Sequence, residues 1–166
     1  FCSTACVYDL RGASGLLCED APVGSHWAYG QDKAACEQIY LAAHRDERFQ
    51  VTVFRPSHVY RGAAVVHQLG LDGVLALRRM ARDQPVLVLD GGRALWQACH
   101  SRDAGVAFAA ACLNPPSYGR IYNLGLGTLS WREYYQAMGQ ALGRTPHILS
   151  IDSQLLAERD EPTRYE

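Results

Sequence analysis

The stretch AYGQDKAACEQIYLAAHRDERFQVTVFRP, residues 28–56, decides the fold class of this chain. Its first part, 28–45, consists mostly of helix-forming residues and predicts a helix. An apolar stripe along this helix is indicated by four residues: Ala35, Ile39, Ala42 and Ala43. The segment 50–54 is short and rich in β-branched residues, and an Arg-Pro step ends it, which predicts a strand. A helix followed at once by a strand is typical of parallel α/β sheets.

The same alternation continues on both sides of this stretch. Further strands are expected at 1–8, 86–89, 95–100 and 120–124, with an extended segment at 145–151, and helices at 74–82, 103–113 and 131–142. The last helix has a clear start, because Ser130 and Glu133 have the spacing of a capping box. The segment 125–130 is interpreted as the entry into that helix. The whole pattern predicts a largely parallel α/β sheet.

Composition excludes several classes of protein. A length of 166 residues with 48% hydrophobic and 20% charged residues is typical of a globular domain. The net charge of −1 predicts neither nucleic acid nor anionic lipid as a partner, and no apolar run is long enough to span a bilayer. The six cysteines form no C-x-x-C pair, which predicts free thiols in a reducing cytoplasm and no metal site. The N-terminus shows no signal-peptide pattern. Because Phe1 is not a start methionine and the chain opens inside an apolar, strand-like run, we expect a truncated or processed start.

The strongest chemical signal is the segment YGQDK, residues 29–33. Tyr29 and Lys33 are four residues apart, so a helix places both side chains on one face. A phenol is a poor base at neutral pH, and a neighbouring ammonium group favours its phenolate form. The pair is therefore suited to moving a proton on an alcohol or a carbonyl. The spacing alone leaves a second interpretation open, which is an ordinary solvated helix face.

Polar side chains also stand at two predicted strand ends. Ser3 and Thr4 lie at the first, and Ser57 and His58 follow the strand 50–54. Ligands of open α/β sheets bind outside the carboxyl ends of the strands. We therefore expect these side chains to share one crevice with Tyr29 and Lys33.

Five motifs, in this order, resemble one known family. They are Ser3-Thr4-x-x-Val7-Tyr8, Tyr29-Gly30-x-x-Lys33 with Glu37, Arg55-Pro56-x-x-Val59-Tyr60, His100-x-x-Asp103, and Tyr122-Asn123-x-Gly125 with the Ser130/Glu133 helix start. Over nearly all of residues 1–150 the chain resembles the extended short-chain dehydrogenases/reductases, also called the NAD-dependent epimerase/dehydratase family. Each motif is common by itself, and the ordered set is specific.

The resemblance implies a catalytic site. Tyr29 is expected to be the general acid/base, and Lys33 to favour its phenolate and to hydrogen-bond the nicotinamide ribose. Thr4 is expected to hydrogen-bond the same substrate oxygen, with Ser3 behind it. The cofactor implied is NAD or NADP, so Tyr29 and Lys33 also count as cofactor-binding residues.

Pro56 and Ser57 are the further residues expected at the cofactor, presenting their backbone to the nicotinamide. His58 and Trp96 are candidates for substrate binding. For both of them a structural role stands beside the functional one: His58 as a loop histidine, and Trp96 as a core residue.

The chain also departs from the family pattern. The Gly-rich dinucleotide fingerprint is absent, and its only lookalike, 125–130, ends in serine. Ala5-Cys6 stand where the sugar dehydratases of the family carry an Asp-Glu pair. Trp96 occupies a position where nucleotide-sugar enzymes often place an arginine that binds a diphosphate. These departures from the family pattern predict a substrate other than a nucleotide sugar. They also argue against a dehydration that uses an Asp-Glu pair.

The expected fold is α/β: the C-terminal portion of a Rossmann-like parallel sheet with a small α/β substrate-binding part. Residues 1–62 are expected to form the remainder of the Rossmann-like domain. Residues 63–166 are expected to be mainly substrate-binding, with 100–125 packing back on the sheet. A homodimer is expected through the Tyr29 helix.

The expected function is that of an NAD(P)-dependent epimerase or oxidoreductase. Its substrate would be a small, sugar-like molecule or another molecule with a hydroxyl or carbonyl group. We expect the chain by itself to be inactive, because the half that grips the adenosine is missing. The alternative is a non-catalytic binding or regulatory protein on the same scaffold, for example one that binds RNA.

Overall fold

The computed structural model describes residues 1–11, 16–62, 65–69 and 73–157. The chain divides into two compact units. Unit 1 comprises Phe1–Val59 and Ala98–Leu126, and unit 2 comprises Tyr60–Gln97 and Gly127–Glu166. Three strands carry the chain from one unit to the other and are hydrogen-bonded in the order β2-β4-β6: β2 (His58–Tyr60), β4 (Leu95–His100) and β6 (Leu126–Ser130).

Unit 1 is built around two parallel strands, β1 (Val53–Pro56) and β5 (Ile121–Leu124). Phe54 of β1 stands opposite Tyr122 of β5. On its other edge β1 pairs with the start of the chain, where the backbone of Phe54 exchanges hydrogen bonds with Phe1 and Ser3. β1 is therefore an inner strand, and unit 1 confirms the predicted parallel α/β architecture.

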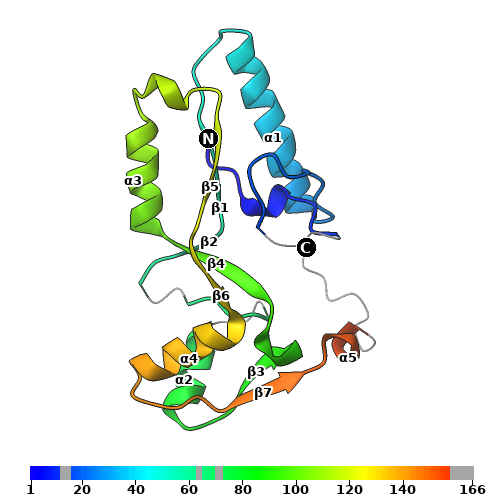
Figure 1. Ribbon diagram of the computed structural model, residues 1–166, viewed down its shortest axis with the longest axis vertical. Coiled ribbons are helices and arrows are strands. Elements are labelled where there is room, and N and C mark those ends of the chain that lie inside the picture. The colour runs from blue at the N-terminus through cyan, green and yellow to red at the C-terminus, as the bar shows by residue number, and fades with distance from the viewer. Residues whose placement is uncertain (12–15, 63–64, 70–72, 158–166) are drawn as a thin grey trace. The chain divides into compact units, whose positions relative to one another are not determined.

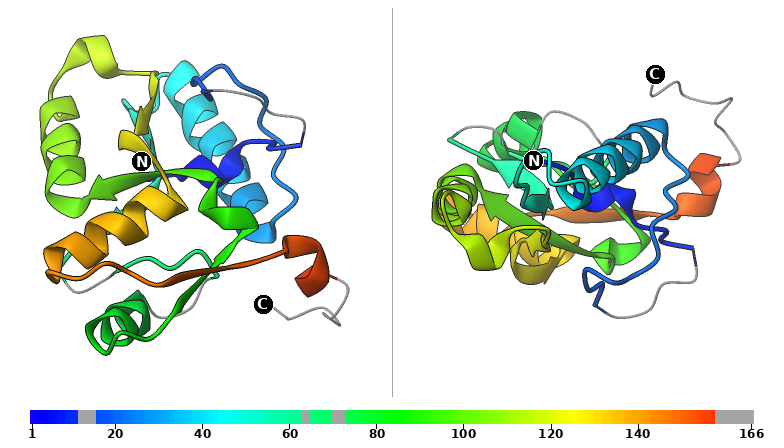
Figure 2. Two further views of the ribbon diagram at one scale, coloured as in Figure 1. Left: turned by 60° about the horizontal axis from the view of Figure 1, so that its bottom comes forward. Right: turned by 90° about the horizontal axis from the view of Figure 1, so that it is seen from above.

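Two helices cover the opposite faces of this small sheet: α1 (Ala28–Arg45) and α3 (Ser101–Ala111). Successive side chains of a strand point to opposite faces, and β1 shows this directly. The ring of Phe54 contacts Phe108 of α3 at 4.6 Å between centroids, whereas the next residue, Arg55, pairs with Glu37 of α1. Figures 1 and 2 show α1 and α3 flanking the strands of unit 1.

The prediction of a strand over 1–8 is wrong for most of its length. Only Cys2 forms a parallel bridge to β1, and Ala5–Val7 form a short 3-10 helix instead. The reason lies at Thr4, whose hydroxyl oxygen accepts a hydrogen bond from the backbone N–H of Cys6 at 3.2 Å. A threonine hydroxyl can replace sheet partners in this way and turn the chain.

The predicted bounds of α1 are confirmed, but its buried face is not the predicted one. Only Gly30, Glu37 and Ala43 are buried, and Ile39 is 68% exposed. Gly30 is required by a close approach, because a side chain there would collide with the carbonyl oxygen of Cys6 and with Ser25. The most deeply buried contacts of the helix are therefore a tight glycine contact, a carboxylate and Ala43, and of the predicted stripe only Ala43 is buried.

Unit 2 contains a second parallel pair, β3 (Val86–Leu89) with β7 (Ile148–Ile151), in which Val86 stands opposite Ile148. Its helices are α2 (Gly73–Ala81), α4 (Trp131–Ala141) and the short α5 (Ser153–Ala157). Short 3-10 turns lie at Asp90–Gly92 in unit 2 and at Pro115–Ser117 in unit 1.

An aromatic cluster forms the core of unit 2. The rings of Trp96 and Trp131 stack at 4.7 Å between centroids, with an angle of 11° between their planes. Tyr134 meets Trp96 edge-on at 4.6 Å, and Tyr135, which is fully buried, packs against Tyr134. We refer to Trp96, Trp131, Tyr134 and Tyr135 as the aromatic cluster.

Two details near helix starts test the sequence predictions. The capping box at α4 is confirmed, because Ser130 and Glu133 exchange the expected hydrogen bonds. The segment before it is the strand β6, however, not a simple helix entry. α3 begins at Ser101, earlier than predicted, because the imidazole of His100 accepts from the backbone N–H of Arg102 and caps the helix.

Candidate active site

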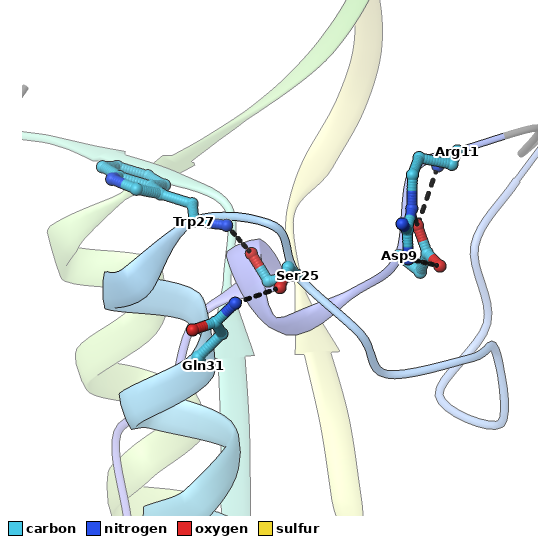
Figure 3. A network of polar contacts seen from close by, with 5 residues as sticks. All are labelled: Asp9, Arg11, Ser25, Trp27 and Gln31. Atoms are coloured by element: carbon cyan, nitrogen blue, oxygen red, sulfur yellow. Dashed lines mark hydrogen bonds and ion pairs between the residues drawn. The ribbon is translucent and has the colours of Figure 1, made fainter.

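The first turn of α1 is fixed by Ser25, as Figure 3 shows. The Ser25 hydroxyl accepts from the backbone N–H of Trp27 at 3.1 Å, and the side-chain amide of Gln31 donates to the Ser25 carbonyl at 3.0 Å. These two hydrogen bonds of Ser25 define the start of the helix that carries Tyr29.

In the same view the guanidinium of Arg11 donates two hydrogen bonds to Asp9, which lower the pKa of Asp9 to about 2.

The structure brings Tyr29 and Lys33 together. The Nζ atom of Lys33 lies 5.9 Å from the centroid of the Tyr29 ring. The same ammonium group donates to the carbonyl oxygen of Cys2 at 3.0 Å, so it also reaches the backbone next to Ser3 and Thr4. Tyr29 is 44% exposed, which leaves its phenol accessible to a substrate. Of the expected grouping, the structure shows the contacts of Lys33 with Tyr29 and with the backbone at Cys2; a shared crevice with the hydroxyls of Ser3 and Thr4 stays a prediction.

Ser3 and Thr4 are both buried, and their hydroxyls differ in hydrogen bonding. Thr4 Oγ1 accepts from the N–H of Cys6 and still carries a proton to donate. Ser3 is 2% exposed, and its hydroxyl has no hydrogen-bond partner among the described residues. Buried hydroxyls without a partner are uncommon and call for an explanation, such as a bound group.

Pro56 and Ser57 lie at the end of β1 as expected. Pro56 is buried and, as a proline, has no N–H to donate. The N–H of Ser57 is already used in the sheet, where it donates to the carbonyl of Leu124 at 2.8 Å. The Ser57 hydroxyl is buried and without a partner among the described residues. The group of these two residues that is left without a partner among the described residues is therefore the Ser57 hydroxyl.

His58 and Trp96 stand in different units. His58 follows in β2, where desolvation of its ring lowers its pKa and favours the neutral imidazole. Trp96 belongs to unit 2 and is 8% exposed within the aromatic cluster. This placement gives Trp96 a core role; a contact with substrate remains a prediction for both residues.

One feature near the site was missed by the sequence prediction. Glu37 and Arg55 form a buried ion pair between α1 and β1, with two parallel hydrogen bonds of 2.9 and 2.7 Å. The spacing of Glu37 one helical turn after Lys33 was its only local signal. Among the described residues no cluster of three or more metal-ligating side chains is found, and no helix is both long and apolar enough to cross a bilayer.

A curated relative shares a large part of this sequence. It is 2'-dehydrokanamycin reductase from Streptomyces kanamyceticus, which is 35% identical over 139 residues. The match covers 82% of this chain and 39% of the relative.

Solved structures show the same fold at low sequence identity. One is dTDP-glucose 4,6-dehydratase from Bacillus anthracis in complex with NAD, with a TM-score of 0.72 and 22% identity over 91% of this chain and 48% of that one. Another is UDP-glucuronic acid 4-epimerase from Bacillus cereus in complex with UDP-glucuronic acid and NAD, with a TM-score of 0.72 and 18% identity over 91% and 47%. The chain thus spans less than half the length of these relatives.

A family model covers the whole region in which the Tyr/Lys pair and both strand ends lie. It matches residues 1–125 and describes the NAD dependent epimerase/dehydratase family. The match takes in more than half of the chain, and the ordered motifs at Thr4, Tyr29, Lys33 and Pro56 fall inside it. This chain belongs to the NAD dependent epimerase/dehydratase family.

Proposed function

We propose that the protein is an NAD(P)-dependent oxidoreductase or epimerase that acts on a hydroxyl or carbonyl group of a sugar-like molecule. The observation that carries the proposal is the position of Lys33. Its ammonium group lies beside the Tyr29 ring and bonds the Cys2 carbonyl, next to Ser3 and Thr4. A phenol, an ammonium group and a hydroxyl pair thereby belong to one local arrangement.

The residues present fit the nicotinamide end of the cofactor. The hydroxyls of Ser3 and Ser57 are buried and without a partner among the described residues, as expected of groups that bind something else. The ammonium group of Lys33 has three N–H donors, and the bond to Cys2 uses one of them. We assign Tyr29, Lys33, Pro56 and Ser57 to the cofactor; when bound, NAD(P) supplies or accepts the hydride.

The chain's own residues handle the proton. In the direction of reduction, Tyr29 donates its phenolic proton to the substrate oxygen as the carbonyl becomes an alcohol. The Lys33 ammonium stabilises the phenolate that remains, through its positive charge. Thr4 has its acceptor function engaged by the Cys6 N–H, so its hydroxyl donates to the same substrate oxygen. In the direction of oxidation each proton moves the other way.

The substrate class is suggested by the curated relative and by Trp96. The name of that relative describes the reduction of 2'-dehydrokanamycin, and we propose a carbonyl reduction on a sugar-like molecule for this protein too. Trp96 is an uncharged side chain packed in the aromatic cluster, so this position supplies no cation for a diphosphate. This supports a substrate other than a nucleotide sugar.

A homodimer through α1 is a further part of the proposal. Ile39, which is 68% exposed on this helix, is available for a contact with a second copy. Ala43, named for the same face, is buried within the chain and does not contribute to such a contact.

The test replaces Tyr29 by phenylalanine in the intact protein. We expect NADH- or NADPH-dependent reduction of 2'-dehydrokanamycin to fall by about 100-fold or more in Tyr29→Phe, because the proton donor is removed. Tyr40→Phe is the matched control, since Tyr40 lies on the same helix and stacks on Phe1. Retained turnover in Tyr29→Phe, or an intact protein that neither binds nor oxidises NAD(P)H, contradicts the proposal.

A further inference from the structure

The buried ion pair between Glu37 and Arg55 stands at the centre of a polar network in unit 1. Both side chains are almost fully buried, with exposed fractions of 1% and 3%. Arg55 Nε donates to Glu37 Oε1 at 2.9 Å, and Nη2 donates to Oε2 at 2.7 Å. This two-point geometry fixes the direction as well as the distance between α1 and β1.

The remaining nitrogen of the same guanidinium reaches two other segments. Arg55 Nη1 donates to the hydroxyl of Tyr8 at 2.9 Å and to the carbonyl of Glu19 at 3.1 Å. The Tyr8 hydroxyl in turn donates to the side-chain oxygen of Asn123 at 2.6 Å. Tyr8 lies four residues after Thr4, so Arg55 connects the Thr4 segment with the helix that carries Tyr29.

Asn123 closes the network from the neighbouring strand β5. Its side-chain amide donates to the carbonyl of Leu17 at 3.0 Å, and its backbone N–H donates to the carboxylate of Glu19 at 2.7 Å. The segment around Leu17 and Glu19 is therefore held from two sides. Five separate parts of unit 1 are thus joined through one guanidinium and one amide: α1, β1, β5, the segment around Tyr8 and the segment 17–19.

The positive charge of Arg55 is maintained within the network. Burial alone would lower the pKa of Arg55, but the hydrogen bonds with Glu37 and Tyr8 outweigh it, and its pKa is raised. The arginine therefore stays charged, and its five N–H donors keep a fixed planar geometry.

The packing of α1 makes this network important for the catalytic pair. Of the 18 residues of the helix, only Gly30, Glu37 and Ala43 are buried. With so few buried residues, the directional bonds of Glu37 contribute a large part of what fixes the rotation of the helix about its axis, together with the close contact at Gly30. Side chains reach about 5–6 Å from a helix axis, so a turn of roughly 10° moves a side-chain tip by about 1 Å.

We propose that Glu37 and Arg55 are positioning residues for Tyr29 and Lys33, which lock the rotation of α1 against β1 and against the Thr4 segment. Glu37 follows Lys33 by one helical turn and Tyr29 by two, so the three share one side of the helix. The inference rests on the proposed function, because it assumes that Tyr29 and Thr4 act on one substrate oxygen. A misplacement of 1 Å at a reacting group is enough to cost about 100-fold in rate.

The alternative role for the ion pair is purely structural, and the two roles can be separated. A buried ion pair can often be replaced by apolar side chains of similar volume without loss of stability. The double variant Glu37→Leu with Arg55→Met removes both charges and leaves neither unpaired. It preserves the packed volume and deletes the directional bonds.

The experiment compares this double variant with the wild-type intact protein and with Gln38→Ala, an exposed neighbour on α1. Cooperative urea unfolding first establishes that each variant is folded. We then expect kcat for 2'-dehydrokanamycin to fall about 10- to 100-fold with KM little changed, and the pH profile of kcat to shift. In protein labelled with fluorotyrosine, the 19F resonance of Tyr29 is expected to move, because the Lys33 ammonium group beside its ring is tied to the Cys2 carbonyl of another segment, and rotation of α1 changes that contact.

A folded double variant with wild-type kcat overturns the proposal, and so does an unmoved Tyr29 resonance. If the double variant does not fold, Arg55→Lys carries the test, because it keeps the charge and loses the two-point geometry. Wild-type kcat or an unmoved resonance in folded Arg55→Lys overturns the proposal equally. Failure of the proposed function is distinct, since it shows as retained turnover in Tyr29→Phe.

Discussion

Each of the two units is stabilised at its own centre by a different kind of interaction. At the centre of unit 1 lie Glu37 and Arg55, whose contacts with Tyr8 and Asn123 are hydrogen bonds of defined direction. At the centre of unit 2 lies the aromatic cluster, in which Trp96 and Trp131 stack face to face. The interactions at the centre of unit 1 are charged and depend on direction. Those at the centre of unit 2 are apolar and tolerate small shifts of the side chains.

The difference follows from what each unit carries. Hydrogen bonds weaken steeply when their geometry changes, so a network of them specifies one arrangement of its segments. Apolar burial depends on contact area and hardly on direction. Unit 1 holds Tyr29, Lys33 and Thr4, which under the proposed function need defined relative positions, and the interactions at its centre are directional. Three predictions probe this contrast.

The largest effect on stability is expected in the aromatic cluster. Trp131 is 7% exposed, and Trp131→Ala removes a large buried side chain together with its contacts to Trp96 and Tyr135. We expect the free energy of unfolding to fall by about 4 kcal/mol. Trp131→Phe is expected to cost less than half as much, since it keeps most of the buried area. Urea unfolding measures both losses. Equal losses of unfolding free energy in the two variants would show that the aromatic cluster depends on defined geometry and not on buried area alone.

A smaller loss with the opposite pattern is expected in unit 1. Glu37→Ala leaves the buried charge of Arg55 without its partner, and we expect a loss of about 3 kcal/mol in the same measurement. Glu37→Gln keeps the size of the side chain but not its charge, and it is expected to lose most of that amount. Arg144→Ala is the control, because its ion pair with Asp83 is exposed and contributes about 0–1 kcal/mol. A harmless Glu37→Gln would remove the distinction between the two centres.

The smallest effect is a pH dependence within unit 2. Burial raises the pKa of Tyr135 to about 12, against the hydrogen bond that its oxygen accepts from the N–H of Gln68. Because the folded pKa lies above the ordinary value of 10, the contribution of neutral Tyr135 is complete below pH 10 and is lost as the pH rises towards 12. This amounts to about 2–3 kcal/mol at most.

Unfolding measured between pH 9 and pH 12 checks this prediction, where Tyr135→Phe is expected to lose less stability than the wild type. Gln136→Ala, an exposed change at the next residue, serves as the control and is expected to follow the wild type. An identical alkaline loss in Tyr135→Phe would show that other groups cause it.

The sequence predicted local features well and long-range ones poorly. The bounds of α1 and β3 agree with the prediction, as does the capping box at Ser130, because helix and cap signals are read from adjacent residues. The strand expected over 1–8 was wrong, because the Thr4 hydroxyl diverts the chain into a 3-10 turn. For Trp96 the sequence left a core role and a substrate contact both open, and the structure places its ring in the aromatic cluster.

For the candidate site, the sequence by itself determined that Tyr29 and Lys33 share a face of one helix, since four residues are close to one helical turn. The ordered motifs likewise determined the family. Only the tertiary structure decided which side of α1 is buried, and that Arg55 rather than an apolar stripe holds it. The physical reason is separation along the chain: Arg55 and Glu37 are 18 residues apart, and Tyr8 and Asn123 are 115 apart. Hydrogen bonds between such distant groups leave no periodic pattern in the sequence, because they exist only after the chain has folded.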